Sequence, residues 1–492
     1  MTSSIKRKLL KGSIWNSIAQ FGAQGINFVL MLVLASLLEP TDFGLLGMVA
    51  VITGFVGYFS EFGFIASMIQ KKDVDELDCN TVYWTSIAFA VVLYGLVYLA
   101  APAVSLFYGD DRLTPITRVV FLGFLFKPWG YIHFVLETKE LNYSKIAIAE
   151  LIAVLVSGTA ALALAFLGFG VWSLVAQHVI KDLARAIALN LMISWKPRFL
   201  FSIERFRLHF VTGMHFTANN LIKFSIENFD YLLVGKLLGP AALGIYTLAF
   251  RLARYFLEKV WHIFGNMLFP AFSKLQSEPE KLRQGLVQVG VLGGFLVVPY
   301  LLFIGFGIDY LIPLLGEKWI PTAPVIRIFI VYLLIFAISM ADEPMLFATG
   351  RVKIVNAFKS INVAVLLVAG IAAIKAYGLT GMAWAYTCVT FVYMCSIKLY
   401  LLRSLRFKVF AFLAGLRSVF ILSGVLLATL SAHSLVMARA PLNIWLTVGG
   451  QCLIIVTVVA LVILSYGVID FRNRRLVPEA VDRMSSYPQS PD

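Results

Sequence analysis

Residues 233–250 read LVGKLLGPAALGIYTLAF and repeat, 200 positions later, the pattern of residues 33–50, VLASLLEPTDFGLLGMVA. In both stretches a proline stands between two apolar segments, which predicts the junction of two membrane helices. Internal repetition of this kind indicates a chain built from two similar blocks. The matching positions are Leu37/Leu237, Leu38/Leu238, Pro40/Pro240 and Gly44/Gly244.

The composition indicates an integral membrane protein. Hydrophobic residues make up 60% of the 492-residue chain and charged residues only 14%, with a mean hydropathy of +0.85. A soluble domain is about one quarter charged. The apolar residues form continuous runs and do not alternate with period 2, as the strands of a membrane barrel would. The expected fold class is therefore all-α.

Fourteen apolar stretches are long enough to cross a membrane, for which a helix needs about 20 residues. Lysine, arginine, proline and glycine separate them. The expected spans are 12–38, 43–69, 81–108, 114–137, 145–167, 169–194, 209–237, 240–270, 285–315, 321–348, 354–375, 379–402, 409–431 and 442–468.

The basic residues set the expected orientation, because lysine and arginine accumulate on the cytoplasmic side of membrane proteins. With fourteen spans, most of the basic residues between spans fall on the side of both termini, which we therefore expect to be cytoplasmic. The same distribution accounts for the net charge of +14 without a nucleic-acid partner. Representative residues on that side are Lys71, Lys72, Lys196, Arg198, Arg205, Arg207, Arg472, Arg474 and Arg475.

The repeat predicts two six-helix lobes of the same membrane orientation, residues 1–204 (spans 1–6) and 205–405 (spans 7–12). Parallel repeats of this kind tend to bind substrate at their interface. Residues 406–470 add spans 13 and 14. Residues 471–492 are polar and contain proline, and we expect them to form a disordered cytoplasmic tail.

Charged side chains follow one face of spans 7 and 8. On a helix, Arg251, Arg254, Glu258 and His262 fall within an arc of about 80°, and Lys259 widens it to about 140°. Span 7 carries a similar stripe, and the first block has a weaker one. The expected cavity-lining residues outside span 8 are Asn219, Asn220, Lys223, Glu227, Asp230, Gln24 and Lys127.

Two explanations of the stripes are open. The charges neutralise each other, as Arg254 would with Glu227 across the helix pair or with Glu258 one turn on. Alternatively they line a water-filled cavity, since a charge at the centre of a membrane helix costs about 2.5–3.5 kcal/mol on insertion scales. Both stripes cross the middle of the membrane and include asparagines that balance no charge. These features favour the cavity.

Motifs for catalysis or cofactor binding are missing from the sequence. It contains neither the GxxxxGK[ST] loop of ATP-binding proteins nor the HExxH zinc motif. We therefore expect a transporter that is not an enzyme, with no catalytic residues, no cofactor and no metal site. The four cysteines form no CxxC pair and indicate neither a disulfide framework nor a zinc site. They are Cys79, Cys388, Cys395 and Cys452.

Several short motifs resemble one family in order and spacing. The likeness runs over residues 5–405, to the polysaccharide transporter branch of the multidrug/oligosaccharidyl-lipid/polysaccharide exporter superfamily, and within it to the colanic-acid-exporter type of lipopolysaccharide and exopolysaccharide flippases. The motifs are KGSIWNSIAQ, LLEPTDFGLLGMVAVITGF, FSEFGFIASMIQKKD, LLVGKLLGPAALGIYTLAFRLA, LFPAFSKLQ, LLGEKWIPTAPVIRIF and FATGRVKI.

The resemblance implies a multi-pass protein of the bacterial inner membrane with two lobes around a cavity. It also implies alternating access and a polyprenyl-pyrophosphate-linked oligosaccharide as cargo. Related lipid-linked precursor flippases carry basic residues in the eighth span, which Arg251 and Arg254 match. Arginine offers a planar fork for phosphate oxygens. Our hypothesis is that Arg251, Arg254 and Lys223 bind the pyrophosphate or acidic sugars.

Ion coupling is a further implication of the resemblance. Some relatives bind a cation through an acidic residue in span 7, for which Asp230 or Glu227 is the match. Their eleventh span adds another acid, whereas this chain has Asn356, Lys359 and Asn362 there. That difference does not favour sodium, and proton coupling through Asp230 or Glu227 is the remaining hypothesis.

Two other functions were weighed. An ion-coupled multidrug or toxin exporter of the same fold would need an acidic cavity, whereas the stripes here are slightly basic. A membrane enzyme that finishes a polysaccharide would need an acid/base group in an outer loop, and no such group is present. The expected partners are the lipid-linked oligosaccharide and membrane lipids, with a polysaccharide polymerase and glycosyltransferases as candidates, and a monomer is the expected state.

Overall fold

The computed structural model describes residues 22–61, 63–140, 142–214, 228–439 and 444–465. Within these residues the chain is all helical, with no strands, and packing divides it into two compact units, Met1–Thr247 and Leu248–Asp492. The boundary lies inside one long helix, α11. The repeat predicts lobes that meet near residue 204, and these lobes stay a prediction.

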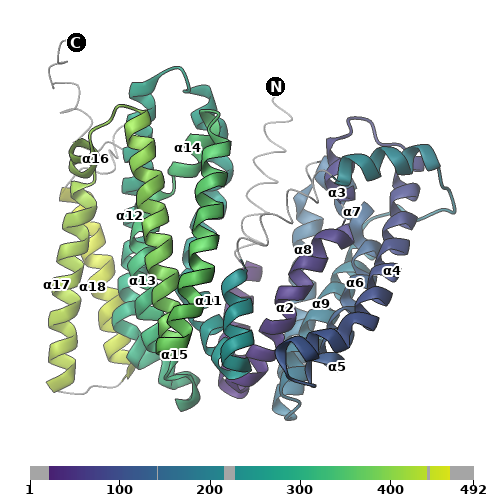
Figure 1. The fold of residues 1–492 in the computed structure, drawn as a ribbon, viewed down its shortest axis with the longest axis horizontal. Coiled ribbons are helices and arrows are strands. Elements are labelled where there is room, and N and C mark those ends of the chain that lie inside the picture. The colour runs from purple at the N-terminus through teal and green to yellow at the C-terminus, as the bar shows by residue number, and fades with distance from the viewer. Residues whose placement is uncertain (1–21, 62, 141, 215–227, 440–443, 466–492) are drawn as a thin grey trace. The chain divides into compact units, whose positions relative to one another are not determined.

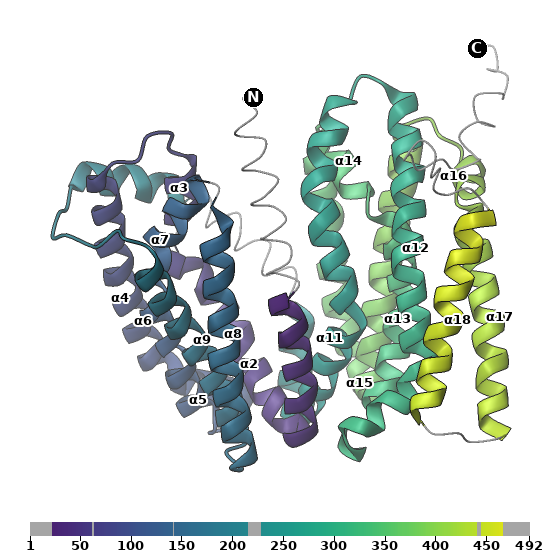
Figure 2. The same cartoon turned by 180° about the vertical axis from the view of Figure 1, so that it is seen from behind.

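Among the described residues, the first unit consists of a helix at Gly22–Leu37, nine further helices and the start of α11 (Figures 1 and 2). In this unit α8 packs extensively against α9, while α4 packs on α5 and α7. The elements are α2 (Pro40–Glu61), α3 (Phe64–Gln70), α4 (Glu76–Tyr108), α5 (Leu113–Val120), α6 (Leu122–Phe126), α7 (Pro128–Lys139), α8 (Tyr143–Phe166), α9 (Val171–Met192), a helix over residues 203–214 and α11 (Phe229–Lys274).

The second unit is a helical bundle around one apolar core that α12, α15, α17 and α18 share. In both views α17 and α18 lie side by side next to α12 (Figures 1 and 2). Its elements after α11 are α12 (Pro279–Leu311), the 3₁₀ turns η1 (Ile312–Leu315) and η2 (Glu317–Trp319), α13 (Thr322–Ser339), α14 (Asp342–Ala348), α15 (Val352–Ser404), α16 (Val409–Gly415), α17 (Arg417–Arg439) and α18 (Ile444–Ser465).

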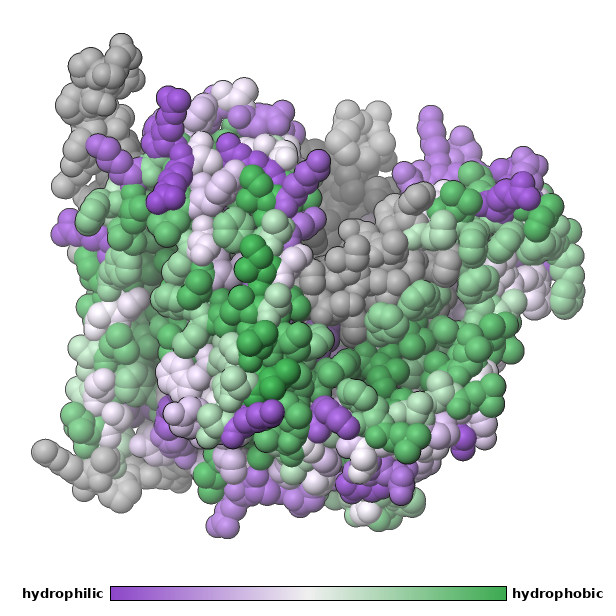
Figure 3. All heavy atoms as spheres, in the orientation of Figure 1, coloured by the Kyte–Doolittle hydropathy of each residue, from purple (hydrophilic) through white to green (hydrophobic). Residues whose placement is uncertain are grey.

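These helices fit a membrane. Nine segments of the described residues are long and apolar enough to span it, and a tenth is the bent pair α5–α6 and α7. Large apolar side chains such as Leu99 and Leu106 are 77% and 82% exposed, as lipid-facing residues are. Hydrophobic side chains cover the middle of each unit and hydrophilic ones gather at its ends (Figure 3).

The helices are consistent with the fourteen expected spans, with three kinds of difference. First, α11 and α15 each join two expected spans through a glycine of positive φ, Gly239 (φ 81°) and Gly378 (φ 59°). Second, the expected span 169–194 is α9, which carries too many charges to pass as an apolar span. The third kind concerns span ends.

Several expected ends need correction because local chemistry sets them. α4 begins at Glu76 and not at 81, since Asp75 accepts the backbone N–H of Asp78 and forms a capping box. α2 begins at Pro40 and not at 43. The expected span 409–431 is the short α16 followed by α17, which ends at Arg439. The expected tail and the start of span 1 lie outside the described residues.

The two copies of the sequence repeat touch each other inside the first unit. A Cβ atom added to Gly44 would lie 1.7 Å from the carbonyl oxygen of Pro240, and one added to Gly244 would lie 1.8 Å from that of Pro40. The contact is reciprocal, as a two-fold relation between repeats requires. Only glycine allows the backbones to approach this closely.

A second pair of glycines supports the repeat. Gly170 joins α8 to α9 with φ 54° and ψ −129°, and Gly378 bends α15 with φ 59° and ψ −137°. They occupy the junctions of expected spans 5–6 and 11–12 and share one backbone conformation. This shared conformation is what a repeat extending beyond the LLxPxxxG motif would predict.

A buried carboxylate anchors the helix over residues 203–214 to the first unit. Asp78 is fully buried, with Lys71 2.5 Å away and Nε2 of His209 3.3 Å away. Nδ1 of His209 lies 2.7 Å from the Ser67 hydroxyl. Burial lowers the pKa of His209, although its hydrogen bond to Asp78 acts in the opposite direction.

Replacing Gly44 or Gly244 by alanine should destabilise the protein. Forcing an extra carbon into a packed site costs about 1–3 kcal/mol, and here the obstacle is backbone. The melting temperature of purified protein checks this. Gly95→Ala is the control, since Gly95 has nothing within 4 Å of an added Cβ and alanine gains about 1 kcal/mol in helix propensity. Equal melting of Gly44→Ala and Gly95→Ala would contradict the reciprocal contact.

The anchoring of helix 203–214 should weaken in acid. Because the pKa of His209 is lowered in the folded state, the unfolded state binds the proton more tightly, so stability is complete above about pH 6.5 and falls below it by at most about 1.4 kcal/mol per pH unit. Melting temperatures at about pH 7.5 and 5.5 measure this change. In His209→Gln the decrease should be smaller, and an unchanged decrease would remove His209 as its cause.

Candidate substrate-binding site

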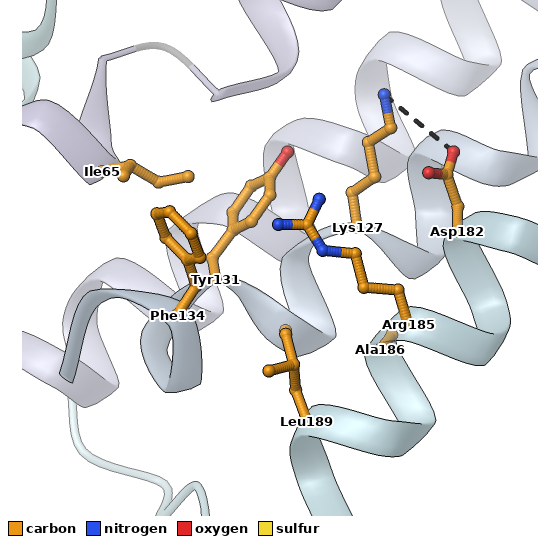
Figure 4. A pocket seen from close by; sticks show the side chains of 9 residues that line it. Ile65, Lys127, Tyr131, Phe134, Asp182, Arg185, Ala186 and Leu189 are labelled. Atoms are coloured by element: carbon orange, nitrogen blue, oxygen red, sulfur yellow. Dashed lines mark ion pairs between the residues drawn. The ribbon is translucent and has the colours of Figure 1, made fainter. Parts of the chain in front are cut away.

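A pocket of about 300 Å³ opens in the first unit among α3, α7 and α9 (Figure 4). Its wall combines aromatic rings with charged groups, as ligand pockets do when a few polar groups orient a bound molecule. The lining residues are Ile65, Lys127, Gly130, Tyr131, Phe134, Asp182, Arg185, Ala186 and Leu189.

Lys127 reaches the pocket because the chain bends there. α6 and α7 meet at Lys127 with a 43° change of direction, and Pro128 has no N–H to continue the helical ladder. The Lys127 ammonium lies 3.9 Å from Oδ2 of Asp182 and 4.3 Å from the centre of the Phe124 ring. The break between α6 and α7 thus determines the position of Lys127, and a hydropathy profile does not reveal this break.

Asp182 approaches its lysine across a glycine. A Cβ atom added to Gly123 of α6 would lie 2.7 Å from Oδ2 of Asp182. A side chain at position 123 would clash with the Asp182 carboxylate, so the glycine allows the carboxylate to lie close to α6. The ion pair is partly wet, with side-chain exposures of 31% for Lys127 and 27% for Asp182.

A second charged group joins α8 to α9 beside the pocket, and Arg185 belongs to both. Glu150 of α8 contacts two cations of α9: its carboxylate lies 2.8 Å from Nζ of Lys181 and 3.5 Å from Nε of Arg185. The Arg185 guanidinium lies 5.6 Å from the Phe134 ring and points toward Tyr131 (Figure 4). The arrangement suits an anionic group on an aromatic wall.

The pocket region carries one more positive than negative charge. Three cations (Lys127, Lys181 and Arg185) face two carboxylates (Glu150 and Asp182). Charged residues within membrane helices are costly and mark binding or transport pathways. A bound anion would neutralise the remaining positive charge.

Sequence reasoning missed four of these five residues. It proposed Lys127 for a cavity, and Lys127 lies in the pocket wall, but it passed over Lys181, Asp182 and Arg185 inside the expected span 169–194, and Glu150 as well. A signal was present, since three charges within five residues disqualify α9 as an ordinary apolar span.

The basic stripe of α11 belongs to the second unit. Arg251 is exposed, and Arg254 lies 4.8 Å from the Phe250 ring and 3.6 Å from the Glu258 carboxylate. The opposite face of the helix is buried, through Leu252, Ala253, Leu257 and Val260. A charged, exposed face on a membrane helix needs water or polar partners and not hydrocarbon.

The remaining expected site residues form two sets, those that the structure describes and those that lie outside the described residues. Asp230 is buried in the first unit and accepts a hydrogen bond of 2.9 Å from the Tyr246 hydroxyl. Gln24 is half-buried in the helix Gly22–Leu37. His262 belongs to α11, but its side chain is outside the described residues. Also outside them are Lys223, Glu227, Asn219 and Asn220.

The fold and the charged groups define an integral membrane protein of a transporter fold. The chain belongs to the polysaccharide biosynthesis protein family, which it matches over residues 33–324. The resemblance stated from its motifs is thereby confirmed.

Curated relatives carry related names. The chain is 29% identical to the lipopolysaccharide biosynthesis protein WzxC of Escherichia coli (strain K12), over 73% of this chain and 74% of the relative. It is 25% identical to the teichuronic acid biosynthesis protein TuaB of Bacillus subtilis (strain 168), over 93% and 96%. It is also 25% identical to the succinoglycan biosynthesis transport protein ExoT of Rhizobium meliloti (strain 1021), over 66% of each.

Solved structures share the fold. The inward closed conformation of the lipid II flippase MurJ superposes with a TM-score of 0.65 at 15% identity, covering 92% of this chain and 99% of that one. An inward-facing multidrug resistance transporter of the MATE family and MOP superfamily gives 0.61 at 13% identity, covering 78% and 94%. At such identities the likeness shows the fold alone.

Replacing Glu150 by glutamine should destabilise the first unit by about 1–2 kcal/mol, because Lys181 and Arg185 lose their shared counter-charge. Breaking a fully buried pair costs about 3–5 kcal/mol, and these side chains are partly wet. Glu280→Gln is the control, since the Glu280 side chain is 59% exposed and Arg283 keeps its hydrogen bonds to the Leu405 carbonyl, and exposed carboxylates of this kind contribute at most about 1 kcal/mol. The melting temperatures of both variants measure the two losses of stability. Equal losses would show that the cluster at Glu150 contributes no more to stability than a surface ion pair.

Proposed function

We propose that this protein is a flippase that moves a polyprenyl-pyrophosphate-linked oligosaccharide across the bacterial inner membrane for lipopolysaccharide or exopolysaccharide biosynthesis. Transport proceeds by alternating access through a basic cavity. The protein performs no catalysis and uses no cofactor. The names of its relatives support a polysaccharide cargo, and the fold that it shares with a lipid II flippase supports a lipid-linked one.

The observation that carries this proposal is the surplus of basic groups on membrane helices. Among the described residues, Lys127, Lys181 and Arg185 lie with Glu150 and Asp182 at or beside the pocket, and one face of α11 carries Arg251, Arg254 and Lys259 with Glu258. A lipid-linked pyrophosphate cannot enter hydrocarbon with its charge unpaired. Basic residues at membrane depth supply that pairing, and arginine does so with two parallel hydrogen bonds.

We assign separate tasks to the two basic groups. Lys127 and Arg185 hold an anionic part of the cargo against the aromatic wall of Tyr131 and Phe134. Arg251 and Arg254, with Lys223, bind the pyrophosphate or acidic sugars.

Ion coupling and assembly complete the proposal. Asp230, with Glu227, is the proposed coupling site in span 7, and the buried hydrogen bond from Tyr246 holds its carboxylate in place. Asn219, Asn220, Gln24 and His262 are proposed to line the cavity. Both termini are cytoplasmic, the protein works as a monomer, and its product goes to a polysaccharide polymerase or glycosyltransferases.

A multidrug exporter is the second candidate, because a multidrug resistance transporter shares the fold. Hydrophobic cations would need a surplus of carboxylates in the cavity. The pocket and the stripe of α11 both have the opposite balance. This charge balance favours the anionic cargo.

Reconstituted protein tests the proposal. Proteoliposomes with a fluorescent polyprenyl-pyrophosphate oligosaccharide should show translocation by the wild type. The double variants Arg251→Ala/Arg254→Ala and Lys127→Ala/Arg185→Ala should each lose at least about tenfold in rate, since one hydrogen bond to a charged group contributes about 1.5–3 kcal/mol and 1.4 kcal/mol is tenfold.

Lys375→Ala serves as the control at matched protein levels, because Lys375 is an exposed cation of α15 outside both basic groups. Its rate should equal that of the wild type. If both double variants transport normally, the basic groups are structural. If the wild type moves no lipid-linked probe but exports a cationic dye under a proton gradient, the second candidate is correct.

A further inference from the structure

Two neighbouring carboxylates, Asp342 and Glu343, stand where expected span 10 is interrupted. α13 ends at Ser339, and α14 begins at Asp342. Pro344 follows directly and has no N–H to continue the ladder. The interruption places two acidic side chains inside the helical bundle of the second unit, where a continuous apolar helix would carry none.

Asp342 forms a sealed ion pair with Lys398 of α15. Its Oδ1 lies 2.6 Å from the Lys398 ammonium, and the side chains are only 3% and 11% exposed. The ammonium also donates to the carbonyl of Ile338 at 3.0 Å and lies 4.5 Å from the Phe412 ring. Apolar residues of the core, among them Met345 and Leu346, surround the pair.

The second oxygen of Asp342 is unsatisfied. Within the described residues Oδ2 is buried and accepts no hydrogen bond, and the same is true of the Ser339 hydroxyl. The two residues are three positions apart in helical backbone, which brings side chains to the same face. The Ser339 hydroxyl can donate to Oδ2 while the acid is ionised, and it can accept a hydrogen bond once Oδ2 carries a proton.

Glu343 connects this interior to a wetter region. Its carboxylate lies 2.7 Å from the Lys359 ammonium and accepts a 2.7 Å hydrogen bond from the Tyr393 hydroxyl. Glu343 and Lys359 are 27% and 29% exposed. The carboxylate that follows Asp342 in the sequence is thus partly hydrated, whereas the Asp342–Lys398 pair is buried. The titratable neighbours from α14 and α15 are Glu343, Lys359, Tyr393 and Cys395, and α13 contributes only the Ser339 hydroxyl.

The charges of the group cancel only while both acids are ionised. Asp342 and Glu343 balance Lys359 and Lys398, so one added proton leaves an unbalanced cation. Lys398 would then keep a carbonyl and an aromatic ring but no carboxylate, in a core where an uncompensated charge is strongly unfavourable. Proton binding at Asp342 and the packing of α14 on α15 are therefore linked.

We propose that Asp342 and Lys398 form a proton-binding site in the second unit that couples proton uptake to the transport cycle. The coupling rests on the proposed transport function. One proton adds to Oδ2 of Asp342, Lys398 keeps its own proton, and the released ammonium displaces the end of α15 from α14. The site is separate from Asp230, which lies in the first unit.

Infrared spectroscopy detects the site without transport. Purified protein in lipid is titrated from about pH 8 to 5, the range in which folded proteins tend to be most stable. The carbonyl stretch of a protonated carboxylic acid should appear in the wild type and be absent in Asp342→Asn. Asp309→Asn is the control, since Asp309 is exposed and paired with Arg327. A wild type without this band, or a band that survives in Asp342→Asn, would overturn the proposal.

Transport under a pH gradient then tests the coupling. The rate of the wild type should change by up to about tenfold per pH unit, the limit for one titrating group. Asp342→Asn/Lys398→Gln removes both charges together and so avoids an unpaired buried charge. This variant should transport with a weaker dependence on pH than the wild type, because Asp230 can still titrate, and an unchanged dependence would overturn the coupling. If the wild type moves no lipid-linked probe, the proposed function fails while the infrared titration still decides the proton site.

Discussion

The high cost of a lone charge inside a membrane determines how this protein is built. Within the described residues, several charged side chains of the membrane helices are paired, as Lys127 is with Asp182, Glu150 with Lys181 and Arg185, and Lys398 with Asp342. Where pairing leaves a surplus, the helix presents an exposed polar face, as α11 does at Arg251. Binding of an anionic cargo and uptake of a proton are two ways of changing that balance. The same electrostatic constraint therefore organises both proposals.

The repeat explains how the helices are positioned. Pro40 and Pro240 end one membrane helix and begin the next, and the carbonyl of each lies against the glycine of the other copy. Glycines of matching conformation, Gly170 and Gly378, join the last two helices of each block. Bends and charges then distinguish the copies, as the break at Lys127–Pro128 and the acids at Asp342 illustrate.

Hydropathy was enough to predict the membrane helices, and several short sequence motifs were enough to indicate the family. Span ends depended on local bonds that hydropathy ignores, such as the capping box at Asp75 that starts α4 five residues early. Of the pocket, only Lys127 was anticipated. Arg185 and Glu150 come from different helices, and Asp342 pairs with a lysine 56 positions away. Which charges meet depends on helix rotation and packing, and these are properties of the folded chain.

Recognition of a lipid-linked anion by the basic groups of the membrane helices can be measured as binding of polyprenyl pyrophosphate to the purified protein, compared with a polyprenol of equal chain length. Binding of the pyrophosphate lipid should be saturable and should weaken as salt is raised, because ion pairs at hydrated sites are screened. The neutral polyprenol should bind weakly and without salt dependence. If the two lipids bind equally, the basic groups do not recognise the anion.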